Sequence, residues 1–235
     1  MSNYIVNFDK FIEGETEKYD NPNKLTIIHP ARVVIAGPSS CGKTNVILNL
    51  LFIKKTSMKY RRVLLYAKML QEPKYQYMIN RFVKIEEILT KLEKKPIKIL
   101  YTSSDLSGVI PLEDLEDCDD IQTIAIFDDF ICEENQEVIK NYWMFGRKFN
   151  VTSFFLGQSF HQIDKFIRDN SNYVILFRVN NYSDLRRIYN DVVKGVDFND
   201  FKKIYDRALV QNINGFVTID NVTPDNNRRV RIGIL

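Results

Sequence analysis

The sequence predicts an α/β fold in which a largely parallel central sheet carries helices on both faces. Apolar, β-branched runs alternate with helical patterns along most of the 235 residues, which is typical of strand–helix–strand units. The stretch at 37–44 fits the pattern G-x-x-x-x-G-K-[ST] and lies between the first such run and the first helical pattern. Together these observations predict a P-loop NTPase fold of the ASCE type.

The chain is expected to consist of a polar arm and one larger domain. Residues 1–31 are dominated by Asn, Asp, Glu and Lys, and Pro22 and Pro30 mark turns among them. We expect one P-loop ATPase domain over 32–235, with 190–235 as a C-terminal extension of the same domain. No signal-peptide core is present, and no apolar run approaches the roughly 20 residues that span a bilayer. We therefore expect a soluble protein without a transmembrane segment.

The expected elements follow from hydrophobic periodicity and from turn residues. Strands are expected at 32–36, 62–67, 97–101, 121–127, 151–156, 173–178, 216–219 and 229–234. Helices are expected at 45–52, 73–81, 85–94, 133–149, 162–168, 182–193 and 198–208, and 111–120 fits an acidic helix or a loop. The run at 121–127 is rich in β-branched residues, as a strand buried on both faces should be. Pro96 ends the helix expected at 85–94.

The glycine-rich loop predicts a phosphate-binding site, the alternative being an ordinary glycine-rich turn. Gly37 and Gly42 permit backbone angles closed to other residues, so successive N–H groups can point into one concavity. The N-terminus of the following helix adds its dipole. We expect Lys43 to bind the terminal phosphates of ATP and the Thr44 hydroxyl to ligate Mg²⁺. The expected nucleotide-binding residues are Gly37, Pro38, Ser39, Ser40, Cys41, Gly42, Lys43, Thr44 and Asn45.

Polar residues that follow two of the expected strands predict the catalytic edge of the sheet. Ligands of such folds bind beyond the carboxyl ends of the strands. We expect Asp128 to hold Mg²⁺ through water and Asp129 to orient or deprotonate the attacking water. If the strand at 151–156 lies between the strands at 32–36 and 121–127, Gln158 comes within reach of the γ-phosphate. Read alone, these residues also fit solvated turns at strand ends.

Composition argues against several other kinds of site. The chain has 33 basic and 30 acidic residues, so a net charge of +3 does not by itself predict nucleic-acid binding. Cys41, Cys118 and Cys132 lack paired spacing, and two histidines are few, so neither a disulfide framework nor a zinc site is expected. Basic clusters, which a ring would gather into a positive channel, lie at 54–55, 59–62, 91–98 and 228–231.

These motifs resemble those of the DNA-packaging ATPases of large DNA viruses and virophages, a branch of the FtsK–HerA superfamily that includes the poxvirus-type genome-packaging ATPase. The resemblance is carried by Walker A at 37–44, Walker B at 124–129, Gly146-Arg147, and the segments 153–160, 167–170 and 174–178. It covers about residues 32–190. The arginine–strand–glutamine block is more specific than the two Walker motifs.

The resemblance implies a motor that drives double-stranded DNA into a preformed capsid without reading its sequence. It implies a homo-oligomeric ring, a pentamer or hexamer, that works with a capsid or portal-vertex protein. It also implies Gln158 as a sensor and Arg147 as an arginine finger for a neighbouring subunit. Arg178 is a second candidate finger, and Arg186 and Arg187 are weaker ones. For Arg147 the alternative is a helix C-terminal cation favoured by the dipole.

The expected location is the host cell cytoplasm or a viral factory, or association with the virion. Asp129 stands where bacterial motors of the superfamily usually carry glutamate, which leaves its role as sole base open. Two other functions also use such a loop: a nucleoside or nucleotide kinase, and a nucleotide-stabilised capsid-assembly protein that does not hydrolyse. Phosphate release without a phosphorylated acceptor would separate the ATPase from both.

Overall fold

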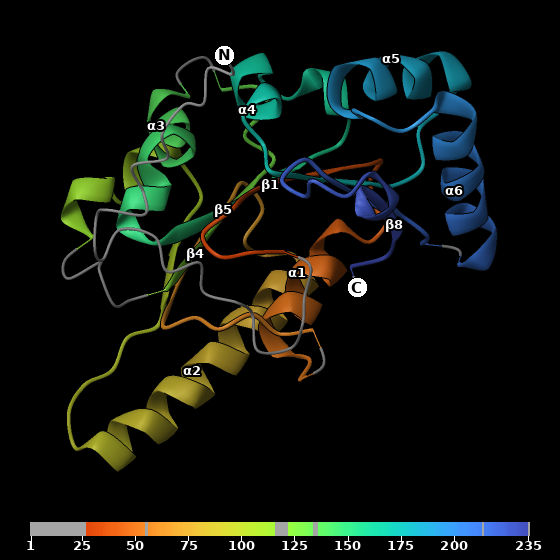
Figure 1. Ribbon diagram of the computed structural model, residues 1–235. Helices are drawn as coiled ribbons and strands as arrows, with labels where there is room; N and C mark the ends of the chain where they lie inside the picture. Colours follow the sequence, from red (N-terminus) through yellow and green to blue (C-terminus); the bar gives the residue numbers. More distant parts are fainter. Residues whose placement is uncertain (1–26, 55, 116–121, 134–135, 213, 235) are drawn as a thin grey trace, which may run out of the picture.

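The computed structural model describes residues 27–54, 56–115, 122–133, 136–212 and 214–234, and Figure 1 shows a central sheet with helices on both faces. Most of the expected arm, at 1–26, lies outside the described residues, as do 116–120 of the expected acidic segment. The division into arm and domain therefore stays a prediction. The predicted α/β class is confirmed.

Eight strands of the described chain form one sheet in the order β3-β2-β4-β5-β1-β6-β7-β8. Their bounds are β1 Arg32–Ala36, β2 Arg62–Ala67, β3 Leu100–Ser103, β4 Thr123–Asp128, β5 Val151–Gly157, β6 Tyr173–Leu176, β7 Val217–Asp220 and β8 Val230–Ile232. Six neighbouring strands of this order, β3, β2, β4, β5, β1 and β6, are mutually parallel. The strands β7 and β8 follow β6 and are antiparallel to their neighbours. The sheet is therefore largely parallel, as predicted.

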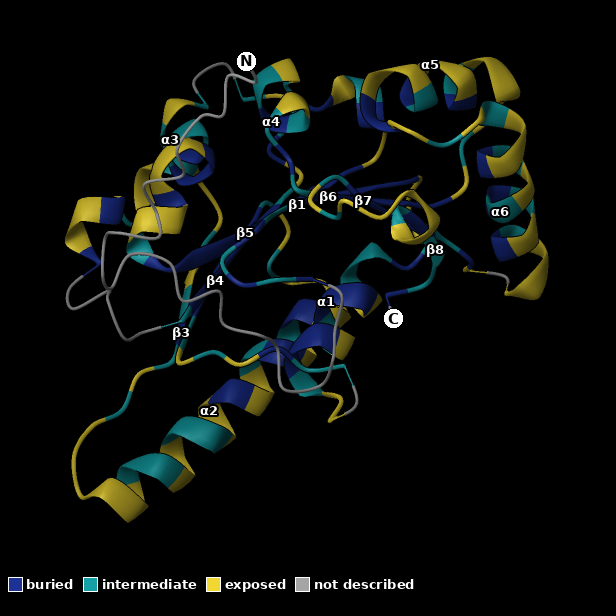
Figure 2. Ribbon diagram, in the orientation of Figure 1, coloured by how far each residue is buried: buried dark blue, intermediate teal, exposed yellow. Residues whose placement is uncertain are grey.

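The helices form one layer on each side of the sheet. The helices are α1 Lys43–Phe52, α2 Pro73–Glu93, α3 Glu137–Phe145, α4 Lys165–Asp169, α5 Tyr182–Val192 and α6 Phe198–Gln211. Short 3-10 turns occupy Leu106–Gly108, Leu112–Asp114, Gly146–Phe149, Phe160–Gln162 and Asn226–Arg228. Buried residues of α1 and α2 belong to one apolar cluster, and those of α3 to α6 belong to the cluster on the opposite face. Figure 2 shows the inner faces of both layers buried, whereas the far half of α2 is intermediate or exposed.

Two expected helices, at 73–81 and 85–94, prove to be one continuous helix, α2. The residues between them include neither glycine nor proline, so no residue there ends the helix. Phe82, one of these residues, is buried in the apolar cluster that contains the buried residues of α1. The expected strand at 97–101 begins later, at Leu100. The Glu86 carboxylate accepts hydrogen bonds from the backbone N–H groups of Ile99 (2.7 Å) and Leu100 (2.8 Å), so α2 holds the entry to this strand.

Two other expected helices are shorter than their patterns. Within the described residues, the expected helix at 133–149 begins at Glu137, while 134 and 135 lie outside them. Just before the helix, the Gln136 side-chain amide donates to the Phe130 carbonyl at 2.8 Å. The pattern at 162–168 becomes a 3-10 turn followed by α4. The Asp164 side chain accepts from the N–H of Phe166 at 2.8 Å, which caps α4 at its first turn.

The position of β5 determines which loops meet. β5 lies between β1 and β4, with Ala36 opposite Gly157 and Asp128 opposite Leu156. The loops that follow these three parallel strands therefore leave the same edge of the sheet. The structure thus meets the condition under which the sequence brings Gln158 to the glycine-rich loop.

Candidate functional site

The glycine-rich loop begins at the end of β1 and is anchored to its neighbour strand. The Gly37 N–H donates to the Gly157 carbonyl at 3.1 Å. A Cβ at Gly37 would lie 2.5 Å from the Phe177 Cβ and 2.8 Å from the Cys41 sulfur, so no larger residue fits without movement. Gly42, the residue that precedes α1, has φ 115°, a conformation that favours glycine. The structure therefore explains why glycine occupies both of these positions in the motif.

Lys43 is the first residue of α1 and folds back onto the loop. Its ammonium group donates to the carbonyls of Gly37 (2.7 Å) and Pro38 (3.0 Å). The start of α1 and this cation thus face the same loop, and both favour a bound anion. The structure therefore places a positive charge at a helix N-terminus within a glycine-rich turn, which suits a polyphosphate.

Asp128 is the last residue of β4 and is half-buried beside this loop. The Tyr75 hydroxyl, from the first turn of α2, donates to the carboxylate oxygen Oδ2. Burial raises the pKa of Asp128 to about 6, although the Tyr75 hydrogen bond and the nearby Lys43 charge lower it. The Asp128 carboxylate therefore lies within the electrostatic influence of the loop lysine.

Thr44 and Asp128 form a donor set that fits Mg²⁺. Burial is the main cause that raises the pKa of Tyr75, and the nearby Thr44 side chain opposes that rise. Thr44 thus lies near the phenol whose hydroxyl bonds Asp128. Thr44 and Asp128 both supply the hard oxygen ligands that Mg²⁺ prefers.

Asp129 and Gln158 lie at the same edge, as expected from the sequence. Asp129 is exposed and has φ 64°, a left-handed conformation that aspartate tolerates, and its N–H donates to the Leu156 carbonyl at 3.4 Å. Gln158 is exposed and directly follows Gly157, whose carbonyl binds the glycine-rich loop. The loop, the two carboxylates and the amide therefore come from three adjacent strands.

Arg147 lies at the opposite edge of the sheet. It is exposed in the 3-10 turn that immediately precedes β5, and it lies near Arg32 at the start of β1. Burial and, to a smaller extent, Arg147 lower the pKa of Arg32. The five-residue strand β1, about 16 Å long, separates this edge from the glycine-rich loop. Arg147 is therefore not part of the site on its own chain.

The other candidate arginines differ in position. Arg178 is exposed just after β6, at the edge that carries the glycine-rich loop. The Tyr205 hydroxyl accepts from the Val179 N–H at 2.7 Å and donates to the Phe177 carbonyl at 3.1 Å, which fixes the backbone on both sides of Arg178. The exposed Arg186 and Arg187 lie on α5.

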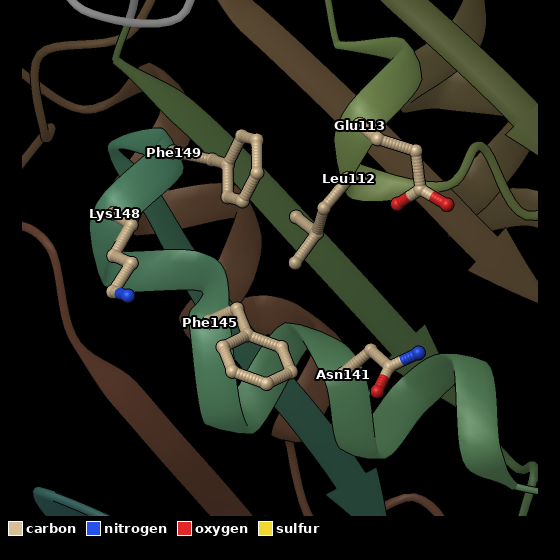
Figure 3. A pocket seen from close by; sticks show the side chains of 6 residues that line it. All are labelled: Leu112, Glu113, Asn141, Phe145, Lys148 and Phe149. Atoms are coloured by element: carbon tan, nitrogen blue, oxygen red, sulfur yellow. The ribbon is translucent and has the colours of Figure 1, made fainter.

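A surface hollow of about 370 Å³ lies away from this site, at the 3-10 turn Gly146–Phe149 (Figure 3). It is lined by Leu112, Glu113, Asn141, Phe145, Lys148 and Phe149. Its position next to the turn that precedes β5 places it at the other edge of the sheet from the glycine-rich loop. The chemistry of the nucleotide site therefore does not involve this hollow.

Sequence reasoning missed two residues of the site, Tyr75 and Glu72. Tyr75 is 1 % exposed and bonds Asp128, and the Glu72 charge is among the causes that raise the pKa of Asp128. Both lie at the start of α2, far along the chain from either Walker motif. The helical pattern at 73–81 predicted the helix but gave no signal that its first turn reaches the end of β4.

In the part of the chain that the structure describes, no helix has both the length and the apolar character that crossing a membrane requires. No curated protein matches the chain at a significant level. Solved structures of proteins from two viruses share the fold of this chain. Their sequence identities to it are low, so the similarity shows the fold alone.

One is the genome packaging NTPase B204 from Sulfolobus turreted icosahedral virus 2 in complex with ATP-gammaS, with a TM-score of 0.54 and 14 % identity. The match covers 86 % of this chain and 96 % of that one. Another is B204, the DNA-packaging ATPase from Sulfolobus turreted icosahedral virus, with a TM-score of 0.54 and 12 % identity over 86 % and 96 % of the two chains.

A family model, described as Poxvirus A32 protein, matches residues 18–219. This match includes every site residue discussed above. It confirms the resemblance to the poxvirus-type branch that the sequence motifs indicated. The chain belongs to the Poxvirus A32 protein family.

Proposed function

We propose that this chain is an ATP-hydrolysing motor that packages double-stranded viral DNA into a preformed capsid. The observation that carries the proposal is the placement of β5, which brings Gln158 and the carboxylate pair to the edge of the glycine-rich loop. Two findings support it, namely family membership and the fold shared with the genome packaging NTPase B204. The same proteins support ATP as the nucleotide.

The proposed roles of the residues follow from their positions. Backbone N–H groups of the loop and the Lys43 ammonium bind phosphate oxygens. Thr44 and Asp128 hold Mg²⁺, which, when bound, supplies positive charge to the phosphates. Asp129 orients the attacking water and takes its proton, and Gln158 contacts the γ-phosphate. These groups supply positioning and charge stabilisation, which are the main requirements of phosphoryl transfer.

The position of Arg147 supports assembly into a ring. An arginine finger at the edge opposite its own site can act only on another subunit. The exposed side chains of Met144 and Phe145 precede it, and such apolar groups favour a protein contact. We propose a pentamer or hexamer in which Arg147 completes the neighbouring site. Arg178, at the edge of its own site, is better placed to act within its own subunit.

The proposed partners are double-stranded DNA, bound through its backbone, and a capsid or portal-vertex protein. Contacts with phosphates make such binding independent of sequence and strongly dependent on salt. The basic clusters named above are the candidate DNA contacts. The proposed location is the viral factory or cytoplasm of the host cell, with association with the virion during packaging.

Phosphate release, measured with and without double-stranded DNA at several protein concentrations, tests the function. We expect DNA to stimulate hydrolysis and the specific rate to rise steeply with protein concentration, because the site needs a neighbour. Transfer of phosphate to a nucleoside or nucleotide acceptor would instead indicate a kinase. Tight binding with negligible hydrolysis in the presence of DNA would indicate a non-catalytic assembly protein.

A mixing experiment tests the role of Arg147. Arg147→Ala retains the glycine-rich loop, and Lys43→Ala retains the arginine, so a mixed ring contains complete sites between unlike subunits. We expect each variant alone to be inactive and the mixture to recover part of the activity. No recovery, in mixtures shown to co-assemble, would assign Arg147 a structural role.

A further inference from the structure

Tyr75 joins three elements of the nucleotide site. Its ring is buried in the apolar cluster that also contains Val46 and Ile47 of α1, and its hydroxyl bonds Asp128 at the end of β4. Met78 and Phe82 continue the same buried face of α2, at most 1 % exposed. Because a buried residue packs α2 against this cluster at each of these turns, the Tyr75 ring is held in place and its hydroxyl has little freedom to move.

The hydrogen bond of this hydroxyl reaches one of the two expected metal ligands. Tyr75 donates its one proton to Oδ2 of Asp128, and the Thr44 side chain lies close enough to the phenol to lower its pKa. A carboxylate has two oxygens that accept, so the bond to Oδ2 leaves the second oxygen of Asp128 available for a cation or its bound water.

We propose that Tyr75 is a positioning residue for the Mg²⁺–nucleotide complex, because its hydroxyl orients the Asp128 carboxylate. The inference rests on the proposed nucleotide site, and it adds a residue outside the Walker motifs. Partners that hydrogen-bond metal ligands fix their orientation, and their loss typically weakens metal binding by about 10–100-fold. The start of α2 thereby becomes part of the metal site.

The test compares nucleotide affinity with and without the metal. The Kd of a fluorescent, non-hydrolysable ATP analogue is measured in EDTA and in saturating Mg²⁺, and the ratio of the two values reports the metal contribution. Tyr75→Phe removes the hydroxyl but keeps the ring. Tyr142→Phe is the matched control, because Tyr142 is also 1 % exposed and donates to a backbone carbonyl, that of Ile110 (2.6 Å), on the other face of the sheet.

We expect wild type and Tyr142→Phe to share one ratio and Tyr75→Phe to show a ratio about 10–100-fold smaller, with an unchanged Kd in EDTA. A wild-type ratio in Tyr75→Phe would overturn the proposal. An equal loss of affinity in EDTA and in Mg²⁺ would also overturn it, since that would indicate a general structural role. If the wild-type Kd is the same in EDTA and in Mg²⁺, both the proposal and the proposed metal site are overturned.

A second measurement asks whether Tyr75 acts through Asp128. In the Asp128→Ala background we expect Tyr75→Phe to leave the ratio unchanged, because the side chain that Tyr75 orients has been removed. Additive losses would contradict the proposed link. These assays contain no DNA and no turnover, so a failure here leaves the motor function open, and a failure of DNA-stimulated hydrolysis leaves Tyr75 open.

Discussion

Replacement of Asp128 by asparagine should stabilise the metal-free protein at neutral pH, even though it removes an expected metal ligand. Burial raises the pKa of this carboxyl from 3.8 to about 6. The folded protein therefore disfavours the ionised form that exists above pH 6. Asparagine carries no charge, and its side-chain oxygen can still accept the hydrogen bond from Tyr75.

The expected gain follows from the size and sign of this pKa change. A rise from 3.8 to about 6, at about 1.4 kcal/mol per pKa unit, corresponds to about 3 kcal/mol. Between these two pH values the folded state binds the proton that the unfolded state has lost, so wild-type stability falls as pH rises through this window. The advantage of Asp128→Asn should thus be absent below about pH 4, grow between pH 4 and 6, and stay constant above.

Denaturant unfolding in EDTA, at a series of pH values from 4 to 8, measures this difference. For a chain of this size about 3 kcal/mol corresponds to roughly 6–12 °C in Tm, so thermal melts give a second reading. Asp129→Asn, at the exposed neighbouring residue, is the control and should change stability by less than about 0.5 kcal/mol. A variant no more stable than wild type at pH 8, or one whose advantage is already complete at pH 4, would refute the reasoning.

Three further predictions concern the loop and the carboxylates. Gly37→Ala places a Cβ 2.5 Å from the Phe177 Cβ and should lower the free energy of unfolding by about 1–3 kcal/mol. The control Gly146→Ala, whose Cβ has its nearest atom at 3.6 Å, should be tolerated, and equal effects of the two substitutions would contradict the argument. Lys43→Ala should abolish nucleotide binding or turnover while leaving Tm nearly unchanged, and full turnover would exclude its phosphate contact. Asp129→Asn should retain nucleotide affinity and lose hydrolysis, and unchanged phosphate release would refute its role as base.

The sequence predicted the sheet better than it predicted the helices around it. Strands buried on both faces, such as β4 and β5, are continuous apolar runs, and their bounds were found within two residues. The order of β5 between β1 and β4 was only a condition in the sequence analysis, and the structure supplies it. Helix limits depended instead on side-chain contacts that are distant in sequence, such as Glu86 with the entry to β3.

The candidate site shows the same division. The loop and the two carboxylates have local signals, because glycine, lysine and acidic residues at fixed spacing reflect chemistry near one strand end. Tyr75 has no such signal: at its helical position a buried tyrosine fits an ordinary core residue. Only the packing of α2 against α1 and β4 brings its hydroxyl to Asp128. The position of Arg147 likewise required the fold, because the parallel pairing of β5 with β1 puts the turn before β5 at the edge opposite the glycine-rich loop.

The central claim is that the loop after β1 and the end of β4 hold one metal–nucleotide complex between them. A crystal structure with a non-hydrolysable ATP analogue and Mn²⁺ in place of Mg²⁺, in which anomalous scattering locates the metal, tests this most directly. We predict one metal peak that contacts the Thr44 hydroxyl and reaches the Asp128 carboxylate directly or through water. A nucleotide bound with its phosphates outside the glycine-rich loop, or a metal remote from Asp128, would contradict the account.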